Sequence, residues 1–163
     1  MALCFVSIGS NIDRERNVRG ALSALREAFG PLLLSSLYET TAVGFDGAPF
    51  YNLVAAFATD APLLRAVEKL REIETAHGRT RDGVRFGPRS LDLDLLLYDD
   101  IVMRAEGIEL PRPEIEKYAF VLGPLAEIAP DLRHPVRGEM YGEAWKHLPK
   151  TAAVKVVRRG LYQ

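Results

Sequence analysis

Two aspartates on one predicted strand face are the residues of this chain best suited to chemistry. Asp92 and Asp94 lie in the segment LDLDLLLY, residues 91–98, where leucines recur with the period of a half-buried strand. Both side chains therefore point to the same face, with Cα atoms about 6.6 Å apart at a rise of roughly 3.3 Å per residue. Carboxylate oxygens on a rigid element suit Mg²⁺, which leaves its remaining positions to water and substrate phosphates. The alternative is a solvated acidic strand face, which is less favoured because aspartate is depleted in strands and like charges on one face repel each other.

An arginine- and glycine-rich loop precedes this strand. Four arginines fall within eleven residues and are interleaved with glycines and a proline: Arg79, Arg81, Arg85 and Arg89, with Gly83, Gly87 and Pro88. The planar guanidinium binds phosphate oxygens with two hydrogen bonds and stays charged, while glycine lets the backbone approach a ligand closely. The loop and the aspartates together predict a polyphosphate site.

Several other catalytic classes lack their residues in this sequence. No segment matches Gly-x-x-x-x-Gly-Lys-Ser/Thr, so the chain is not a P-loop enzyme by sequence. His77, His134 and His147 are far apart and Cys4 is the single cysteine, which argues against a zinc site and excludes an intrachain disulfide. A Ser-His-Asp hydrolase is disfavoured because no nucleophile elbow is present.

The composition is typical of a small globular enzyme. The chain has 163 residues, 48% of them hydrophobic, and a formal charge of −1, which predicts one domain over residues 1–163 around one good core. No apolar run reaches the length of a membrane span, and the first residues lack signal-peptide features. We therefore expect a cytoplasmic protein that binds neither membrane nor nucleic acid, because a nucleic-acid binder would show a basic surface. Cys4 is expected to be buried in a strand, and the protein to be a monomer.

Hydrophobic periodicity predicts alternating strands and helices along the chain. Strands are expected at residues 3–8, 32–40, 53–59 and 91–98, and a short strand or strand pair within 101–110. Helices are expected at residues 14–29 and from a cap at Asp60 to about 77, with Pro113 opening a short helix. The end of the chain is predicted to form a short helix at 142–148 and a closing edge strand at 154–158. This order favours an α+β sandwich, a mainly antiparallel sheet with helices on its faces.

The segment RFGPRSLDLDLLL, residues 85–97, resembles the signature of the 6-hydroxymethyl-7,8-dihydropterin pyrophosphokinase family. Further similarities are SIGSN at 7–11, YETT at 38–41, FYNLV at 50–54, GRTR at 78–81 and AFVLGPLAEIAP at 119–130, so that the resemblance covers about residues 2–148. It implies a ferredoxin-like α/β core. It also implies the transfer of pyrophosphate from ATP, the co-substrate, to the small-molecule substrate 6-hydroxymethyl-7,8-dihydropterin, with release of AMP in folate biosynthesis.

The resemblance also assigns residues to this two-substrate site. Asp92 and Asp94 are expected to hold two Mg²⁺ ions, and Arg81 and Arg89 to neutralise charge on the phosphates in the transition state. The pterin pocket is expected to contain Thr40, Val43, Phe50, Asn52 and Phe120. The ATP site is expected to contain Arg71, Glu74, Arg79, Arg81, Arg85, Phe86, Arg89, Leu95 and Arg112.

The segment LPRPEIEKYAF, residues 110–120, departs from the family pattern. Arg112 stands where a histidine is common, Glu114 and Glu116 replace basic residues, and Tyr118 replaces an arginine. Acidic side chains that face a triphosphate would weaken its binding, so the departure bears on nucleotide affinity. Two other functional classes stay open from the residues alone: a metal-dependent nucleotidyltransferase, which would release pyrophosphate, and a non-catalytic pterin- or nucleotide-binding relative.

Overall fold

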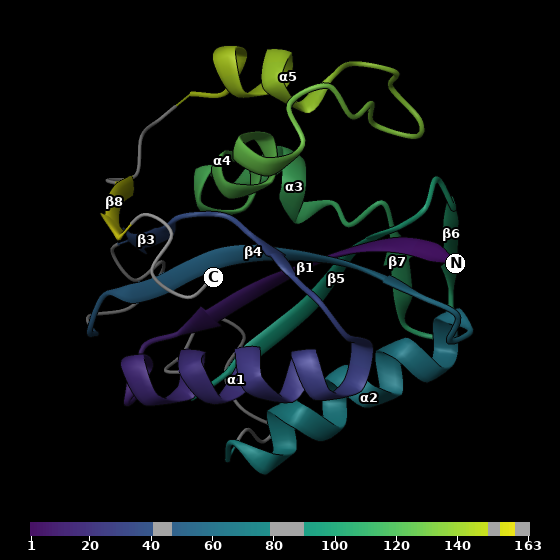
Figure 1. The fold of residues 1–163 in the computed structure, drawn as a ribbon. Coiled ribbons are helices and arrows are strands. Elements are labelled where there is room, and N and C mark those ends of the chain that lie inside the picture. The colour runs from purple at the N-terminus through teal and green to yellow at the C-terminus, as the bar shows by residue number, and fades with distance from the viewer. Residues whose placement is uncertain (41–46, 79–89, 150–153, 159–163) are drawn as a thin grey trace.

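Three long antiparallel strands form the centre of one sheet, β1 (Ala2–Ser10), β4 (Phe50–Thr59) and β5 (Asp92–Tyr98). The computed structural model describes residues 1–40, 47–78, 90–149 and 154–158, and in the last range only the backbone. The strand order is β5-β1-β4-β3-β8, where β3 is Leu37–Thr40 and β8 is Val154–Arg158, and β2 (Leu33–Leu34) also pairs with β4. The pairings between these strands are antiparallel (Figure 1).

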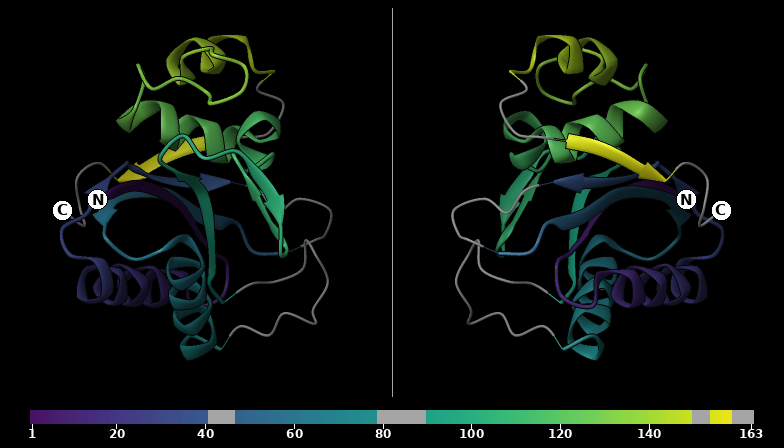
Figure 2. Two further views of the ribbon diagram at one scale, coloured as in Figure 1. Left: turned by 90° about the vertical axis from the view of Figure 1, so that its right-hand side faces the viewer. Right: turned by 90° about the vertical axis from the view of Figure 1, so that its left-hand side faces the viewer.

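Helices cover both faces of this sheet (Figures 1 and 2). Helices α1 (Arg14–Phe29) and α2 (Leu63–Ala76) lie on one face, and α3 (Glu114–Lys117) and α4 (Ala119–Ile128) on the other, with α5 (Tyr141–His147) outside α4. The order β1-α1-β3-β4-α2-β5, with β1 between β4 and β5, is the ferredoxin-like arrangement. The predicted α+β class with a mainly antiparallel sheet is confirmed.

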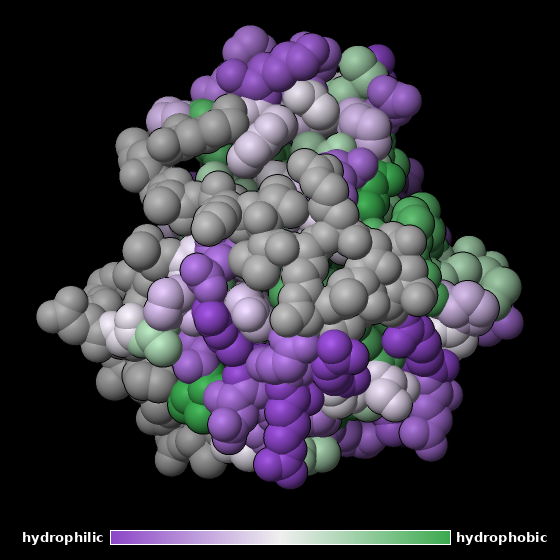
Figure 3. All heavy atoms as spheres, turned by 60° about the vertical axis from the view of Figure 1, so that its left-hand side comes forward, coloured by the Kyte–Doolittle hydropathy of each residue, from purple (hydrophilic) through white to green (hydrophobic). Residues whose placement is uncertain are grey.

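Two apolar clusters hold these layers together, because side chains alternate between the faces of each strand. Val6 and Ile8 of β1 pack with Leu22 and Leu25 of α1 on one side, whereas Phe5 and other residues pack against α4 on the opposite side. On the face shown in Figure 3, hydrophilic side chains dominate the part over α1 and α2. No helix among the described residues is long and apolar enough to cross a bilayer.

Most predicted elements are present, with small shifts of their ends. The helix expected at 14–29 has those bounds, the segment 101–110 forms the antiparallel pair β6 (Met103–Ala105) and β7 (Ile108–Leu110), and the short helix after Pro113 is α3. Strand β8 lies at the sheet edge as expected, and Cys4 is buried.

The prediction of one continuous strand over 32–40 was wrong. The segment is divided into β2 and β3 at Ser35 and Ser36, where side chains take part in the hydrogen bonding. The hydroxyl of Ser35 accepts a hydrogen bond from the Val54 amide at 2.9 Å, and the Ser36 amide donates to the Glu127 carboxylate at 3.0 Å. The Ser35 amide still donates to the Val54 carbonyl oxygen at 2.9 Å. The strand is therefore interrupted at Ser36, whose amide is bound by a side chain.

The predicted cap at Asp60 was also wrong. Helix α2 begins at Leu63 after Pro62, and no side chain caps it, while the Asp60 carboxylate lies 3.7 Å from the amino terminus of Met1. Helix α4 was not predicted, because seven of its ten residues are buried and an almost wholly apolar run has no helical stripe to recognise.

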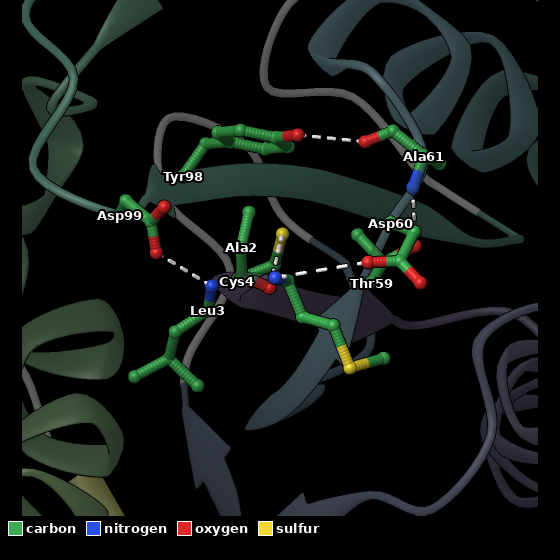
Figure 4. A network of polar contacts seen from close by, with 9 residues as sticks. Ala2, Leu3, Cys4, Thr59, Asp60, Ala61, Tyr98 and Asp99 are labelled. Atoms are coloured by element: carbon green, nitrogen blue, oxygen red, sulfur yellow. Dashed lines mark hydrogen bonds and ion pairs between the residues drawn. The ribbon is translucent and has the colours of Figure 1, made fainter.

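One end of the central strands is closed by hydrogen bonds to the backbone (Figure 4). The Leu3 amide donates to the Asp99 carboxylate at 2.7 Å, and the Tyr98 hydroxyl donates to the carbonyl oxygen of Ala61 at 2.6 Å. The Ala61 amide donates in turn to the Thr59 hydroxyl at 3.0 Å. These contacts join the start of β1 to the ends of β4 and β5.

Candidate active site

Three carboxylates meet at the other end of β5. Oxygen atoms of Glu74, Asp92 and Asp94 all lie within 4.8 Å of one another. Asp92 and Asp94 are half-buried on a strand, while Glu74 comes from α2. A group of hard oxygen donors with this spacing fits a divalent cation such as Mg²⁺. The shared strand face predicted for the two aspartates therefore belongs to a larger acidic group.

Glu74 is the buried member of this group, with only 1% of its surface exposed. Its Oε2 accepts a hydrogen bond from the Leu93 amide at 2.8 Å. Leu93 stands between the two aspartates, so this bond attaches α2 to β5 at the point that presents them. Glu74 was predicted to bind ATP; the structure places it against the strand backbone.

Gly9 lies where the predicted pterin residues meet the predicted metal residues. In the sheet register it is opposite Asn52 on β4 and opposite Asp92 on β5. A Cβ atom at Gly9 would lie 3.1 Å from Asn52 Oδ1, 3.8 Å from Asp92 Cβ and 3.9 Å from Phe50 Cδ1. Residues directly opposite in a sheet point to the same face, so the missing side chain leaves Asn52, Phe50 and Asp92 around one spot.

The predicted pterin residues on β3 and β4 are joined to each other. Asn52 Nδ2 donates to the Thr40 hydroxyl at 2.8 Å, and both side chains are buried. This bond leaves the Asn52 amide a second N–H, which suits the edge of a flat heterocycle. Phe120, at the start of α4, stacks on Tyr118 with ring centroids 5.0 Å apart and packs against the apolar cluster on that face of the sheet.

A small cavity of about 120 Å³ lies along β5, between α2 and β7. Three of the predicted ATP residues line it, Arg71, Leu95 and Arg112, together with Asp94. Arg112 Nη2 is 3.3 Å from Asp94 Oδ1, and Arg112 Nε is 2.5 Å from Glu114 Oε2. Glu114 therefore faces an arginine of this cavity.

Glu116, the second acid of α3, has different partners. One of its carboxylate oxygens contacts His134 Nε2 and the other Arg137 Nε, both at 2.7 Å. His134 Nδ1 accepts from the amides of Val136 and Arg137, so Nε2 carries the proton that it donates to Glu116. Burial lowers the pKa of His134, although Glu116 acts in the opposite direction. Glu116 thus attaches α3 to the segment before α5 and is not among the residues that line the cavity along β5.

Six predicted site residues lie outside the described part of the chain: Val43, Arg79, Arg81, Arg85, Phe86 and Arg89. Their roles stay predictions. Of the remaining predicted residues, Thr40, Phe50 and Asn52 lie at or next to Gly9, and Arg71, Glu74, Asp92, Asp94, Leu95 and Arg112 lie along β5. Phe120 stands at the start of α4 and contacts Tyr118.

Sequence reasoning missed several residues that the structure places at these groups. Val67, Leu70, Ile108 and Glu109 line the cavity along β5, and no signal in the sequence separates them from ordinary helix and strand residues. Gly9 was missed because the first strand was predicted to end at residue 8, whereas β1 continues to Ser10. A glycine inside a strand marks a place where another group approaches the backbone closely.

Comparison with known proteins points to one family. The model of the family described as 7,8-dihydro-6-hydroxymethylpterin-pyrophosphokinase (HPPK) matches residues 5–130. Three relatives carry the name 2-amino-4-hydroxy-6-hydroxymethyldihydropteridine pyrophosphokinase. The protein of Bacillus subtilis (strain 168) is 39% identical over 130 residues, which cover 77% of each chain. That of Pseudomonas aeruginosa is 37% identical over 153 residues, 91% of this chain and 89% of the relative. That of Aquifex aeolicus (strain VF5) is 34% identical over 138 residues, 83% of this chain and 86% of the relative.

A solved structure shares the fold at low sequence identity. The crystal structure of wild-type Plasmodium falciparum HPPK-DHPS superposes with a TM-score of 0.71 and 13% identity, covering 89% of this chain. The match covers 44% of that longer chain. At this identity the likeness supports the fold alone.

Proposed function

This chain belongs to the 7,8-dihydro-6-hydroxymethylpterin-pyrophosphokinase family, and from that premise we propose how its residues carry out the reaction. The enzyme transfers a pyrophosphoryl group from ATP to 6-hydroxymethyl-7,8-dihydropterin, in folate biosynthesis. ATP and the pterin alcohol give AMP, the pterin diphosphate and a proton: the hydroxymethyl oxygen forms a bond to the β-phosphorus, and the bond from that phosphorus to the oxygen bridging to the α-phosphate breaks. We propose that residues 1–163 act as one catalytic domain.

The observation that carries this assignment is the row of residues across three strands, Asn52, Gly9 and Asp92. An amide that can bind the edge of a heterocycle and a carboxylate that can bind a metal lie on one face, and the residue between them in the sheet register is a glycine. A flat pterin seated over Gly9 would place one end at Asn52 and the other towards Asp92. Phe50 and Phe120 are the aromatic side chains proposed to pack on its ring.

We propose that Asp92 and Asp94 hold two Mg²⁺ ions, because the donor set of three close carboxylates fits hard cations. When bound, such ions stabilise charge on the attacking and leaving oxygens of an in-line displacement. Glu74 keeps the two aspartates in place through the Leu93 amide. Arg71, Leu95 and Arg112 would receive the nucleotide in the cavity along β5, and Arg81 and Arg89 would neutralise the transferred phosphates. A cytoplasmic location and a monomeric state stay predictions.

One assay tests this function. The protein is incubated with ATP, Mg²⁺ and 6-hydroxymethyl-7,8-dihydropterin, and AMP is measured against a control without the pterin. We expect pterin-dependent AMP formation. Release of pyrophosphate in place of AMP would indicate a nucleotidyltransferase, and pterin binding without any turnover would indicate a non-catalytic relative; either result contradicts the proposal.

A further inference from the structure

Arg112 lies between Asp94, a proposed metal ligand, and Glu114. Its Nη2 lies 3.3 Å from Asp94 Oδ1, and its Nε lies 2.5 Å from Glu114 Oε2. The Nε atom of Arg112 and the Oε2 atom of Glu114 are shielded from solvent, and neither has a hydrogen-bond partner with good geometry among the described residues. The two shielded atoms therefore depend on each other for charge compensation, while the other end of the guanidinium reaches Asp94.

A fixed positive charge at this distance opposes a divalent cation on the same carboxylate. Charges a few ångströms apart interact appreciably near a protein surface, where solvent screens them only in part. Asp94 and Arg112 are each about one-third exposed, at 31% and 34%. Arg112 therefore weakens cation binding at Asp94 for as long as the guanidinium stays there.

Arg112 also lines the cavity in which the nucleotide is proposed to bind. A triphosphate in that cavity offers oxygens to which arginine binds strongly with its planar fork. The guanidinium can turn from Asp94 to the phosphates while Glu114 retains its Nε side. The nucleotide would thus remove the charge that opposes the metal.

We propose that Arg112, held by Glu114, is a positioning residue that couples metal binding to nucleotide binding. Without nucleotide Arg112 neutralises Asp94 and keeps metal affinity low; with nucleotide it leaves Asp94, and the metal binds more tightly. Linkage makes the effect reciprocal, so the metal raises nucleotide affinity by the same factor. The inference rests on the proposed function only in taking the second ligand to be a nucleotide.

The direct test is Mn²⁺ binding, measured by calorimetry on the full chain without nucleotide or pterin. We expect Arg112→Gln to bind Mn²⁺ about fivefold more tightly than wild type, and Glu114→Gln to bind it about threefold more weakly, in the range of modest couplings between sites. Arg137→Gln and Glu116→Gln are matched controls, because they make the same charge changes in the neighbouring Arg137–Glu116 pair. Equal shifts of Mn²⁺ affinity in the controls would overturn the proposal, because they would show a general effect of charge.

A double variant tests whether Glu114 acts through Arg112. In the Arg112→Gln background, Glu114→Gln should leave Mn²⁺ affinity unchanged, because the guanidinium that Glu114 holds is absent. If Glu114→Gln weakened Mn²⁺ binding in this background as much as in wild type, Glu114 would not act through Arg112. Should Arg112→Gln fail to fold by thermal unfolding, Arg112→Lys replaces it, since a single ammonium lacks the fork that reaches both carboxylates.

The effect of the nucleotide is tested with a non-hydrolysable ATP analogue. The analogue should tighten Mn²⁺ binding in both proteins, but by about fivefold less in Arg112→Gln than in wild type. An identical increase in Mn²⁺ affinity in the two proteins would refute the proposed coupling. None of these measurements involves turnover, so they fail or succeed independently of the AMP assay.

Discussion

The two ends of strands β1, β4 and β5 use their polar groups differently. At one end, side chains of Asp99, Tyr98 and Thr59 bond to backbone groups of neighbouring segments and close the sheet (Figure 4). At the other end, Asn52 and Asp92 flank a glycine on one face. The second end, the active end of the proposed function, differs because side chains from two strands converge there across a glycine.

The sharpest test of this difference compares aspartates at the two ends. Asp92→Asn or Asp94→Asn should reduce AMP formation about a hundredfold or more, as expected when a group that stabilises transition-state charge is lost, and should leave the fold intact. Asp99→Asn is the matched control, because an asparagine oxygen still accepts from the Leu3 amide; its turnover should stay within about twofold of wild type. Near-wild-type turnover in both active-end variants would leave Asp92 and Asp94 as an ordinary solvated strand face.

Gly9→Ala should affect the active end alone. The added Cβ would lie 3.1 Å from Asn52 Oδ1, so the amide or the pterin must shift. We expect kcat/KM for the pterin to fall about tenfold to a hundredfold, the cost of a displacement of about 1 Å in a positioned substrate. Mn²⁺ affinity in the absence of substrates is the internal control and should not change. An unaltered kcat/KM would show that the pterin does not lie over Gly9.

Glu74 connects the active end to α2, and its replacement should lower the free energy of unfolding. Glu74→Ala leaves the buried Leu93 amide without its acceptor, which costs about 1–3 kcal/mol. Glu74→Gln keeps an amide oxygen at that place, so we expect it to recover most of the loss in urea unfolding. Equal destabilisation by both variants would mean that the charge of Glu74, and not its hydrogen bond, stabilises β5.

The smallest expected effect is a change in stability with pH that is due to Cys4, which lies at the closed end of the strands. Burial, and secondarily the charge of Asp99, raises the pKa of the Cys4 thiol from 9.0 to about 12. Because the raised pKa favours the protonated folded state, its stability contribution is complete below pH 9 and is lost as pH rises towards 12.

The free energy of unfolding of wild type should therefore fall by about 1 kcal/mol more than that of Cys4→Ala between pH 9 and pH 10. A thiol reagent at pH 8 should modify Cys4 in urea but not in the native protein. Rapid native modification would contradict the burial of this thiol.

How far the sequence predicts the molecule depends on whether a feature is local. The 3.6-residue stripe of α1 and the period-two leucines around Asp92 are local patterns, and both elements were predicted. Strand pairing is not local, so the meeting of Asn52 and Asp92 at Gly9 needed the structure. The same holds for Glu74, whose partner is nineteen residues away along the chain. The directions of Glu114 and Glu116 depend on Arg112, His134 and Arg137 in the fold, and single-sequence patterns carry no such information.

The hydrogen-bonded sheet fixes the spacing of the row Asn52, Gly9 and Asp92. Its members lie on three adjacent strands, so the backbone hydrogen bonds of the sheet set the distance from the β4 position to the β5 position at two strand spacings, about 9.5 Å. No loop movement can change that length. The side chains of Asn52 and Asp92 come closer together than these backbone positions, because a Cβ atom at Gly9 would lie 3.1 Å from Asn52 Oδ1 and 3.8 Å from Asp92 Cβ. The backbone of the sheet therefore holds the residues proposed for the pterin and the metal at a fixed separation before either ligand binds.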